Sequence, residues 1–274
     1  MITNLRLAAS FLTRVPLHRD PDPNDPDQDD PVQDDSAMSR AVPWFMVVGL
    51  VLGTMQALVY ASLLQILPAL LAAVLAIAAL ALITGAFHHD GLADMADAFG
   101  GGWTVDQRLE ILKDSRLGTY GVTALTLAIV TEVAALSAVA AGSGAAAVIA
   151  AHTLSRAMSG LAMIVGRPAK ASGLGVDYLA GLPRSAVGAS VLGAVGIAAV
   201  VAGVWALVAS IVAGLVMVMV LQLANRKIGG ISGDVLGAVQ QLTKLAVLIT
   251  LVAVVSMAAN GEYAVRWGGL LLGG

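Results

Sequence analysis

The sequence predicts an all-α, polytopic integral membrane protein with about seven transmembrane helices and a cytoplasmic N-terminus. Of its 274 residues, 58% are hydrophobic and 12% are charged, whereas soluble domains carry about 25% charge. Aromatic residues make up only 4% and glycines number 30, which is typical of closely packed membrane helices rather than an outer-membrane barrel. The chain has no cysteine, which excludes disulfides, thiol nucleophiles and cysteine-ligated metal centres.

The first segment, 1–17, predicts a short helix that lies on the membrane surface. Its apolar positions Ile2, Leu5, Ala9 and Leu12 recur at three- and four-residue spacing, which gives a helix one apolar face. A signal peptide is not indicated, because two arginines interrupt the apolar run and no small-residue cleavage pattern follows it. A disordered tail is the alternative.

The next segment, 18–40, is acidic and proline-rich, and we predict a disordered loop there. Eight of the 18 acidic residues lie within 20–35, and the prolines among them prevent a regular helix. Outside 20–35, the other 10 acidic residues face all 15 basic ones, so the rest of the molecule is mildly basic. That balance suits a membrane surface or a phosphorylated substrate. Residues 41–274 are predicted to form a single transmembrane helical catalytic domain.

Seven apolar runs are long enough to cross a membrane, since a span needs roughly 20 residues. The last of them is polar in its first ten residues. The predicted spans cover about 43–66, 69–87, 120–141, 145–166, 186–203, 205–224 and 235–259.

The distribution of lysine and arginine predicts the orientation of these spans. Basic residues occur before the first span and after the second, fourth and sixth, whereas the other inter-span turns contain none. Because retained positive charge marks the cytoplasmic side, the N-terminus is expected inside and the C-terminus outside, with Arg266 as the exception. Nearly all polar groups then lie on one face, which favours an enzyme acting from the cytoplasm over a transporter open to both sides.

The segment 85–102 contains the strongest candidate for a metal site. In a continuous helix, Asp90, Asp94 and Asp97 fall within about 60° of one another around the axis. Three carboxylates on one face repel one another unless a cation binds them, and oxygen ligands favour Mg²⁺ or Mn²⁺. The alternative is that Asp90 is an N-cap and the other two are solvated surface charges.

Two histidines precede this acidic face. His88 is a candidate base or ligand because it lies two residues before Asp90, whereas His89 is expected to point elsewhere, towards the membrane interface. The following polar segment predicts a capped helix that begins at Thr104. Near its end, Lys113, Asp114 and Arg116 are candidate substrate-binding residues, because cations beside a magnesium site would grip phosphate oxygens. Alternatively, the cations only mark the cytoplasmic side.

A third polar region, 225–238, is predicted to return to the same membrane face. Gly230 and Gly233 precede Asp234, which opens the last helix, so backbone N–H groups and the helix dipole there suit phosphate. Asp234 is a candidate metal ligand, with a simple N-cap as the alternative.

The third and fourth predicted spans contain polar residues, among them Glu132, His152, Ser155 and Arg156. A charge inside a span costs on the order of 3 kcal/mol and is rarely without a role. Arg156 either lines a polar cavity and binds a phosphate or pairs with Glu132 to lock two helices. His152 is expected to form a hydrogen bond between helices.

With these residues identified, the chain resembles the cobalamin synthase family, adenosylcobinamide-GDP ribazoletransferase. Departures such as His89, Ala98 and Ser232 remove no carboxylate. The resemblance rests on the blocks FLTRVP (11–16), TGAFHHDGLADMADAF (84–99), RLEILKDSRLGTYG (108–121), SR (155–156), GLG (173–175) and GGISGDVLGA (229–238).

The resemblance implies the last step of cobalamin nucleotide-loop assembly. In that step α-ribazole or its 5′-phosphate displaces GMP from adenosylcobinamide-GDP, with Mg²⁺ as cofactor. It implies a site on the cytoplasmic face of the inner membrane, with His88, Asp90, Asp94 and Asp97 as catalytic residues. Membrane lipid, a second copy of the chain or other cobalamin-assembly enzymes are the expected partners, and nucleic acid is not expected. One alternative is a CDP-alcohol phosphotransferase, although its D-G-x-x-A-R motif is not met, since D-G-L-A-D-M (90–95) has no arginine there. The other is a corrinoid or small-molecule transporter.

Overall fold

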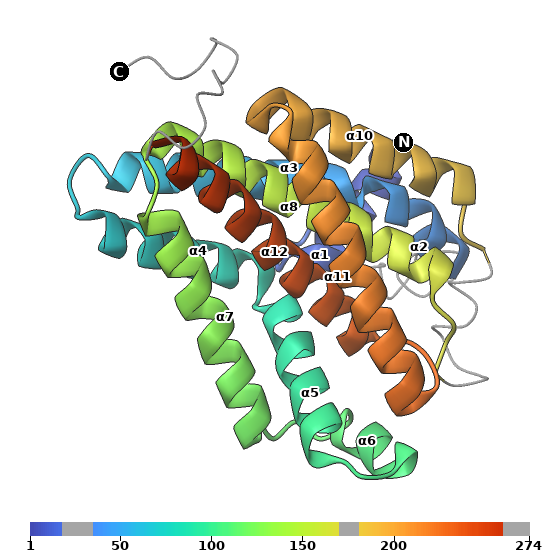
Figure 1. Ribbon diagram of the computed structural model, residues 1–274. Helices are drawn as coiled ribbons and strands as arrows, with labels where there is room; N and C mark the ends of the chain where they lie inside the picture. Colours follow the sequence, from blue (N-terminus) through green and yellow to red (C-terminus); the bar gives the residue numbers. More distant parts are fainter. Residues whose placement is uncertain (18–34, 170–180, 260–274) are drawn as a thin grey trace.

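The fold is a bundle of α-helices, as predicted (Figure 1). A computed structural model describes residues 1–17, 35–169 and 181–259. Within those ranges the one extended feature is an isolated parallel bridge between Pro168 and Ile231. The helices in chain order are α1 (Ile2–Leu12), α2 (Asp35–Ala41), α3 (Phe45–Leu63), α4 (Ala69–Thr84), α5 (Phe87–Gly101), α6 (Val105–Ile111), α7 (Thr119–Ser137), α8 (Ala141–Val165), α10 (Arg184–Ala202), α11 (Trp205–Ile228) and α12 (Gly233–Ala259).

Six helices of the described chain are long and apolar enough to cross a membrane, and a bent pair brings the number to seven if it forms one span. The prediction of about seven membrane helices is therefore confirmed. Six predicted spans match single helices within a few residues, the first of them extended by α2. The six are Ala37–Leu63, Thr119–Ser137, Ala141–Val165, Arg184–Ala202, Trp205–Ile228 and Gly233–Ala258.

The second predicted span, 69–87, differs because the chain turns before its end. Helix α4 ends at Thr84, and α5 leaves it at an angle of 89°. Two consecutive left-handed residues make this turn, Gly85 with φ 63° and Ala86 with φ 56°. An alanine at positive φ is uncommon and costs of order 1–3 kcal/mol, so the surrounding packing must hold the bend in place.

Helix α8 forms the centre of the bundle and packs against α3, α10 and α12. Of its most apolar stretch, 72% is buried inside the protein, against 28% for α7. Helix α3 approaches it closely through Gly49, where an added Cβ would lie 2.4 Å from the carbonyl oxygen of His152. This close crossing places polar side chains of α3 and α8 opposite each other in the bundle interior.

The N-terminal segment packs against the bundle. Helix α1 buries Leu7, Ala8 and Leu12 in a cluster that includes Phe45 of α3. The predicted loop 18–40 ends earlier than expected, because α2 begins at Asp35, and 18–34 lie outside the described residues. The apolar face of α1 is buried against the rest of the protein. The predicted position of α1 on the membrane surface stays a prediction.

Candidate functional site

Helices α5 and α12 cross at two glycines and thereby bring acidic residues of both helices together. A Cβ added to Gly91 would lie 2.8 Å from the carbonyl oxygen of Asp234 and 3.1 Å from the Cα of Gly237. No side chain fits between the helices at this point. The helix predicted through the aspartates is confirmed as α5, and Asp90 and Asp94 on it lie beside the start of α12.

The carboxylates of Asp90 and Asp94 have no hydrogen-bond or ion-pair partner within the part of the chain that the structure describes. Asp94 is close enough to Asp90, Asp234 and Asp97 for each of them to repel its charge. No lysine or arginine among the described residues offsets that repulsion at Asp94. These acids are therefore a concentration of negative charge that a bound cation would stabilise.

Asp97 differs from the other acids because both of its oxygens accept hydrogen bonds from the protein. The backbone N–H of Gly118 donates to one oxygen at 2.7 Å, and that of Gly121 donates to the other at 2.8 Å. A Cβ on either glycine would collide with this carboxylate. Asp97 thus fixes the first turn of α7 to α5, and its predicted role in metal binding remains a prediction.

The acids form no complete metal site on their own. Among residues 1–17, 35–169 and 181–259, no three acidic or histidine side chains are placed to hold one ion together. The donor chemistry nevertheless suits Mg²⁺, which protein sites commonly bind through one or two carboxylates, with substrate phosphates and water as the other ligands. Asp90, Asp94 and Asp234 offer such carboxylates.

The loop after α5 is fixed rigidly to the end of α11. Arg108 donates to three backbone carbonyls, those of Gly102, Trp103 and Lys227, and the Lys227 ammonium donates to the carbonyl of Phe99. The predicted capping box at Thr104 is confirmed. As a result, the polar ends of α5, α11 and α12 lie at one end of the bundle (Figure 1).

The predicted phosphate-binding cations lie on the surface at this end. Lys113 and Arg116 are exposed, and the Arg116 guanidinium forms an ion pair of 2.6 Å with Asp114. Hydrogen bonds from Arg116 hold the pKa of the Asp114 carboxyl below its usual range. An exposed pair of this kind opens at little cost, so Arg116 is available to an incoming anion.

The two candidate glycines before α12 have different surroundings. Gly230 packs against the segment after α8, where an added Cβ would lie 2.3 Å from the carbonyl oxygen of Arg167. Nothing lies within 4 Å of a Cβ added to Gly233. Ser232 caps α12 by accepting a hydrogen bond from the N–H of Val235, so Asp234 lies in the first turn and is not the N-cap.

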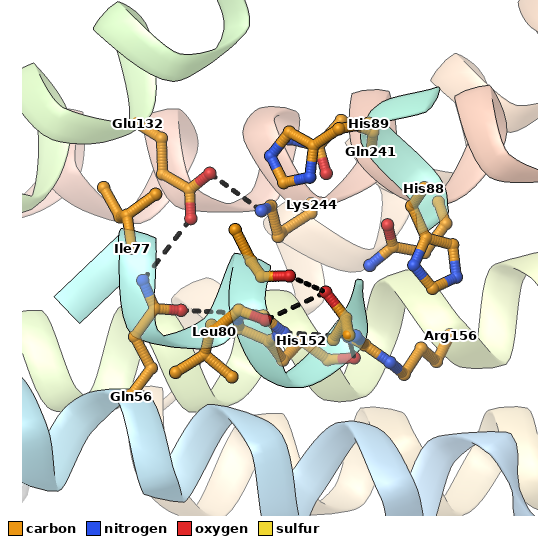
Figure 2. A pocket seen from close by; sticks show the side chains of 13 residues that line it. Gln56, Ile77, Leu80, His88, His89, Glu132, His152, Arg156, Gln241 and Lys244 are labelled. Carbon is orange, nitrogen blue, oxygen red and sulfur yellow. Dashed lines mark hydrogen bonds and ion pairs between the residues drawn. The ribbon is translucent and has the colours of Figure 1, made fainter. Parts of the chain in front are cut away.

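Arg156 and His88 lie away from the acids, in a hollow between α3, α4, α5, α7, α8 and α12. Figure 2 shows the polar side chains that line it turned towards one another, with His88 next to Arg156. The hollow is partly open to the surroundings. Both residues are buried, with 6% of His88 and 2% of Arg156 exposed.

A chain of hydrogen bonds crosses this interior. Lys244 forms an ion pair of 2.7 Å with Glu132, and the Gln56 amide nitrogen donates to the other Glu132 oxygen at 3.4 Å. His152 binds the Gln56 carbonyl oxygen through Nε2 at 2.6 Å and Nη1 of Arg156 through Nδ1 at 2.8 Å. These partners assign His152 as a neutral imidazole that donates from Nε2.

The structure corrects two expectations about this interior. Glu132 pairs directly with Lys244 and not with Arg156. His89 does not face the membrane interface, because its ring lines the hollow and accepts a hydrogen bond from Gln241 at 3.2 Å. The expected hydrogen bond from His152 to another helix is confirmed.

Sequence reasoning missed Lys244, Gln56, Gln240 and Gln241. The signal that could have found three of them is the polar first third of the last span, where a charged residue in an apolar run calls for a partner.

Comparisons with known proteins agree over most of the chain. A family model described as Cobalamin-5-phosphate synthase matches residues 4–252. A protein of Bradyrhizobium diazoefficiens named adenosylcobinamide-GDP ribazoletransferase is 40% identical over 256 residues, which are 92% of this chain and 94% of the relative. A protein of the same name from Shewanella frigidimarina is 36% identical over 90% of this chain and 93% of the relative.

A third protein of that name, from Azorhizobium caulinodans, is 43% identical over 192 residues, which are 67% of this chain and 72% of the relative. No solved structure shows a significant match to this chain.

Proposed function

The chain belongs to the cobalamin-5-phosphate synthase family, and from that membership we propose that it transfers adenosylcobinamide phosphate from adenosylcobinamide-GDP to α-ribazole or α-ribazole 5′-phosphate. GMP is the leaving group, and the product is adenosylcobalamin or its 5′-phosphate. The observation that carries this proposal is the acidic cluster of α5 and α12 in a chain related to transferases of that name. The site would face the cytoplasm from the inner membrane.

The reaction is a phosphoryl displacement. A ribose hydroxyl oxygen of the acceptor attacks the phosphorus that bears cobinamide, and the bond from that phosphorus to the GMP oxygen breaks. GMP leaves with the bonding electron pair, and the hydroxyl proton passes to a base. Catalysis of such a transfer is mostly positioning and stabilisation of charge on the phosphate oxygens.

In this proposal, Asp90, Asp94 and Asp234 hold Mg²⁺ against the pyrophosphate. When bound, the ion would neutralise charge on the phosphate oxygens and orient the diphosphate. The absence of a complete three-ligand site in the described residues fits an ion whose remaining ligands come from substrate and water. Asp97 would keep α5 and α7 in place through its bonds to Gly118 and Gly121.

The exposed cations and the glycine turn at the same end would bind the nucleotide. Lys113 and Arg116 would supply positive charge from the surface, and the space beside Gly233 at the start of α12 is open, since nothing lies within 4 Å of its added Cβ. We assign the proton to an Asp carboxylate, because His88 lines the interior hollow. Catalysis by His88 stays a prediction.

The test is an assay of GMP release by the full-length protein in detergent. We expect release that requires adenosylcobinamide-GDP, an α-ribazole acceptor and Mg²⁺ together, and that stops on addition of EDTA. A CDP-alcohol donor should give no product. GMP release without an acceptor, or turnover of the CDP-alcohol instead, would contradict the proposal.

A further inference from the structure

The Arg156 side chain lines the interior hollow and has an unused hydrogen-bonding edge. Its Nη1 is held by His152, whereas neither Nε nor Nη2 has a partner among the described residues, and Nε is completely buried. The Nε–Nη2 edge is a planar fork that matches two oxygens of a phosphate or carboxylate. A buried, unused fork of this kind is suited to bind an anion.

The charge balance of the hollow also favours an anion. Arg156 and Lys244 are both buried there, and Glu132 is the one carboxylate among the residues that line the hollow. Because Lys244 already neutralises Glu132 at 2.7 Å, the charge of Arg156 is uncompensated. Buried charges in proteins are normally paired, so an anionic group of the ligand would complete this interior.

A second unpartnered group points to a ligand that also carries a hydroxyl. The carbonyl oxygen of Gln240 is buried without a hydrogen-bond partner, because its amide nitrogen is occupied by Ser155 at 3.1 Å. This oxygen can only accept, so it requires an O–H or N–H donor. Ribose hydroxyls and the P–OH of a phosphate monoanion are such donors.

The hollow and the acidic cluster share helices α5 and α12. On α12, Gln240 follows Asp234 by six residues, a rise of roughly 9 Å, and on α5 His88 precedes Asp90 by two. A nucleoside whose sugar hydroxyl lies at the acids could therefore extend its other end into the hollow. The family description, Cobalamin-5-phosphate synthase, names a product that keeps a phosphate ester.

We propose that the hollow beside Arg156 binds the 5′-phosphate of the acceptor, so that Arg156 makes the enzyme prefer α-ribazole 5′-phosphate to α-ribazole. This inference rests on the proposed function and assigns one of its two acceptors to a site. The Arg156 fork binds the phosphate oxygens, and Gln240 accepts from a hydroxyl of the ligand. The acids and exposed cations bind the diphosphate of the donor separately.

The first measurement uses the unmodified protein. We expect kcat/KM for α-ribazole 5′-phosphate to exceed that for α-ribazole by about tenfold or more, because hydrogen bonds to a charged group are lost without the phosphate. Equal values for the two acceptors would overturn the inference while leaving the proposed function intact. GMP release with neither acceptor would instead contradict the proposed function.

The second measurement removes the fork. Arg156→Gln should lower kcat/KM for the phosphorylated acceptor on the order of 10- to 100-fold and change that for α-ribazole by less than about twofold. Arg156→Lys keeps the charge but not the fork. Its kcat/KM for the phosphorylated acceptor should lie between those of the unmodified protein and Arg156→Gln. The matched control is Arg167→Gln, because Arg167 is an exposed arginine just after α8. This substitution should leave kcat/KM for both acceptors unchanged.

A purely structural role for Arg156 predicts a different result. Both acceptors would then lose activity equally in Arg156→Gln, together with folded yield, and the inference would be wrong. If the Gln variant does not fold, the Lys variant and the acceptor ratio of the unmodified protein still decide between the two roles.

Discussion

Glu132 and Lys244 form an ion pair in the membrane interior, where either charge alone would be costly. Both side chains are about 95% buried or more, with 3% and 5% exposed. The pair also anchors the chain of bonds through Gln56 and His152 that ends at Arg156. The position of the guanidinium therefore depends on residues of three other helices.

Breaking this pair one residue at a time should destabilise the protein strongly. We expect Lys244→Met to lower the free energy of unfolding by about 3–5 kcal/mol, because it leaves Glu132 buried and uncompensated. The double variant Glu132→Gln/Lys244→Met should recover most of that loss. Thermal unfolding in detergent measures the stability of the single and double variants. If the double variant loses as much stability as the two single variants added together, Glu132 and Lys244 do not stabilise each other.

Single residues also show where sequence reasoning ends. The spacing of Asp90, Asp94 and Asp97 predicted a shared face, because helical periodicity is local information. The two oxygens of Asp97 instead accept hydrogen bonds from the N–H groups of Gly118 and Gly121. Those bonds depend on how α5 packs against α7. Such a contact joins residues more than 20 apart, and no single-sequence pattern encodes it.

The crossing of helices α5 and α12 determines how close Asp90 and Asp94 lie to Asp234. Gly91 lies against the backbone of Asp234 and Gly237, so the distance between the acids on α5 and Asp234 depends on the absence of a side chain there. A methyl group would push the two helices apart by tenths of an ångström or more.

Replacing this glycine should therefore reduce activity without removing any polar group. Gly91→Ala is expected to lower kcat about tenfold or more, in line with the sensitivity of transfer reactions to small misplacements, and to raise the Mg²⁺ concentration needed for half-maximal rate. Gly188→Ala in α10 is the control, since nothing lies within 4 Å of its added Cβ. Equal activity of the two variants would show that the crossing does not position the site.

The bend between α4 and α5 could not be predicted from the sequence. The run 69–87 contains no proline and its only glycine, Gly85, lies near the end, so its hydropathy indicates a continuous span. The structure instead places Ala86 in the left-handed region and turns the helix by 89°. Tertiary packing of α5 against α7 and α12 overrides the local preference of this alanine.

For the whole molecule, the sequence was sufficient to predict the helical membrane fold and to place most of the membrane helices within a few residues. Hydropathy determines those features residue by residue. Among the described residues, the polar segments that follow α5 and α11 lie together at one end of the bundle (Figure 1). A polar cavity at Arg156 was one of two readings of the sequence, but the rest of its lining was not predictable, because it comes from six helices. Two polar regions result, an acidic cluster of α5 and α12 and a cationic hollow in the interior.

In the proposed function, the acids carry out the chemistry and the interior hollow recognises a phosphate ester. The central claim is that Asp94 and its neighbours bind the divalent cation that the transfer requires. The variant that tests it is Asp94→Asn, which keeps the shape of the side chain and removes its charge, compared with Asp106→Asn on the exposed face of α6.

The decisive measurement is the rate of Mg²⁺-dependent GMP release by these two variants, purified at equal folded yield. We expect Asp94→Asn to lose at least about 100-fold in kcat, because a bound ion contributes several kcal/mol of charge stabilisation, while Asp106→Asn stays within about twofold of the unmodified protein. An Asp94→Asn variant that releases GMP at the same rate and with the same Mg²⁺ requirement as Asp106→Asn would contradict the assignment of the acidic cluster as the metal site.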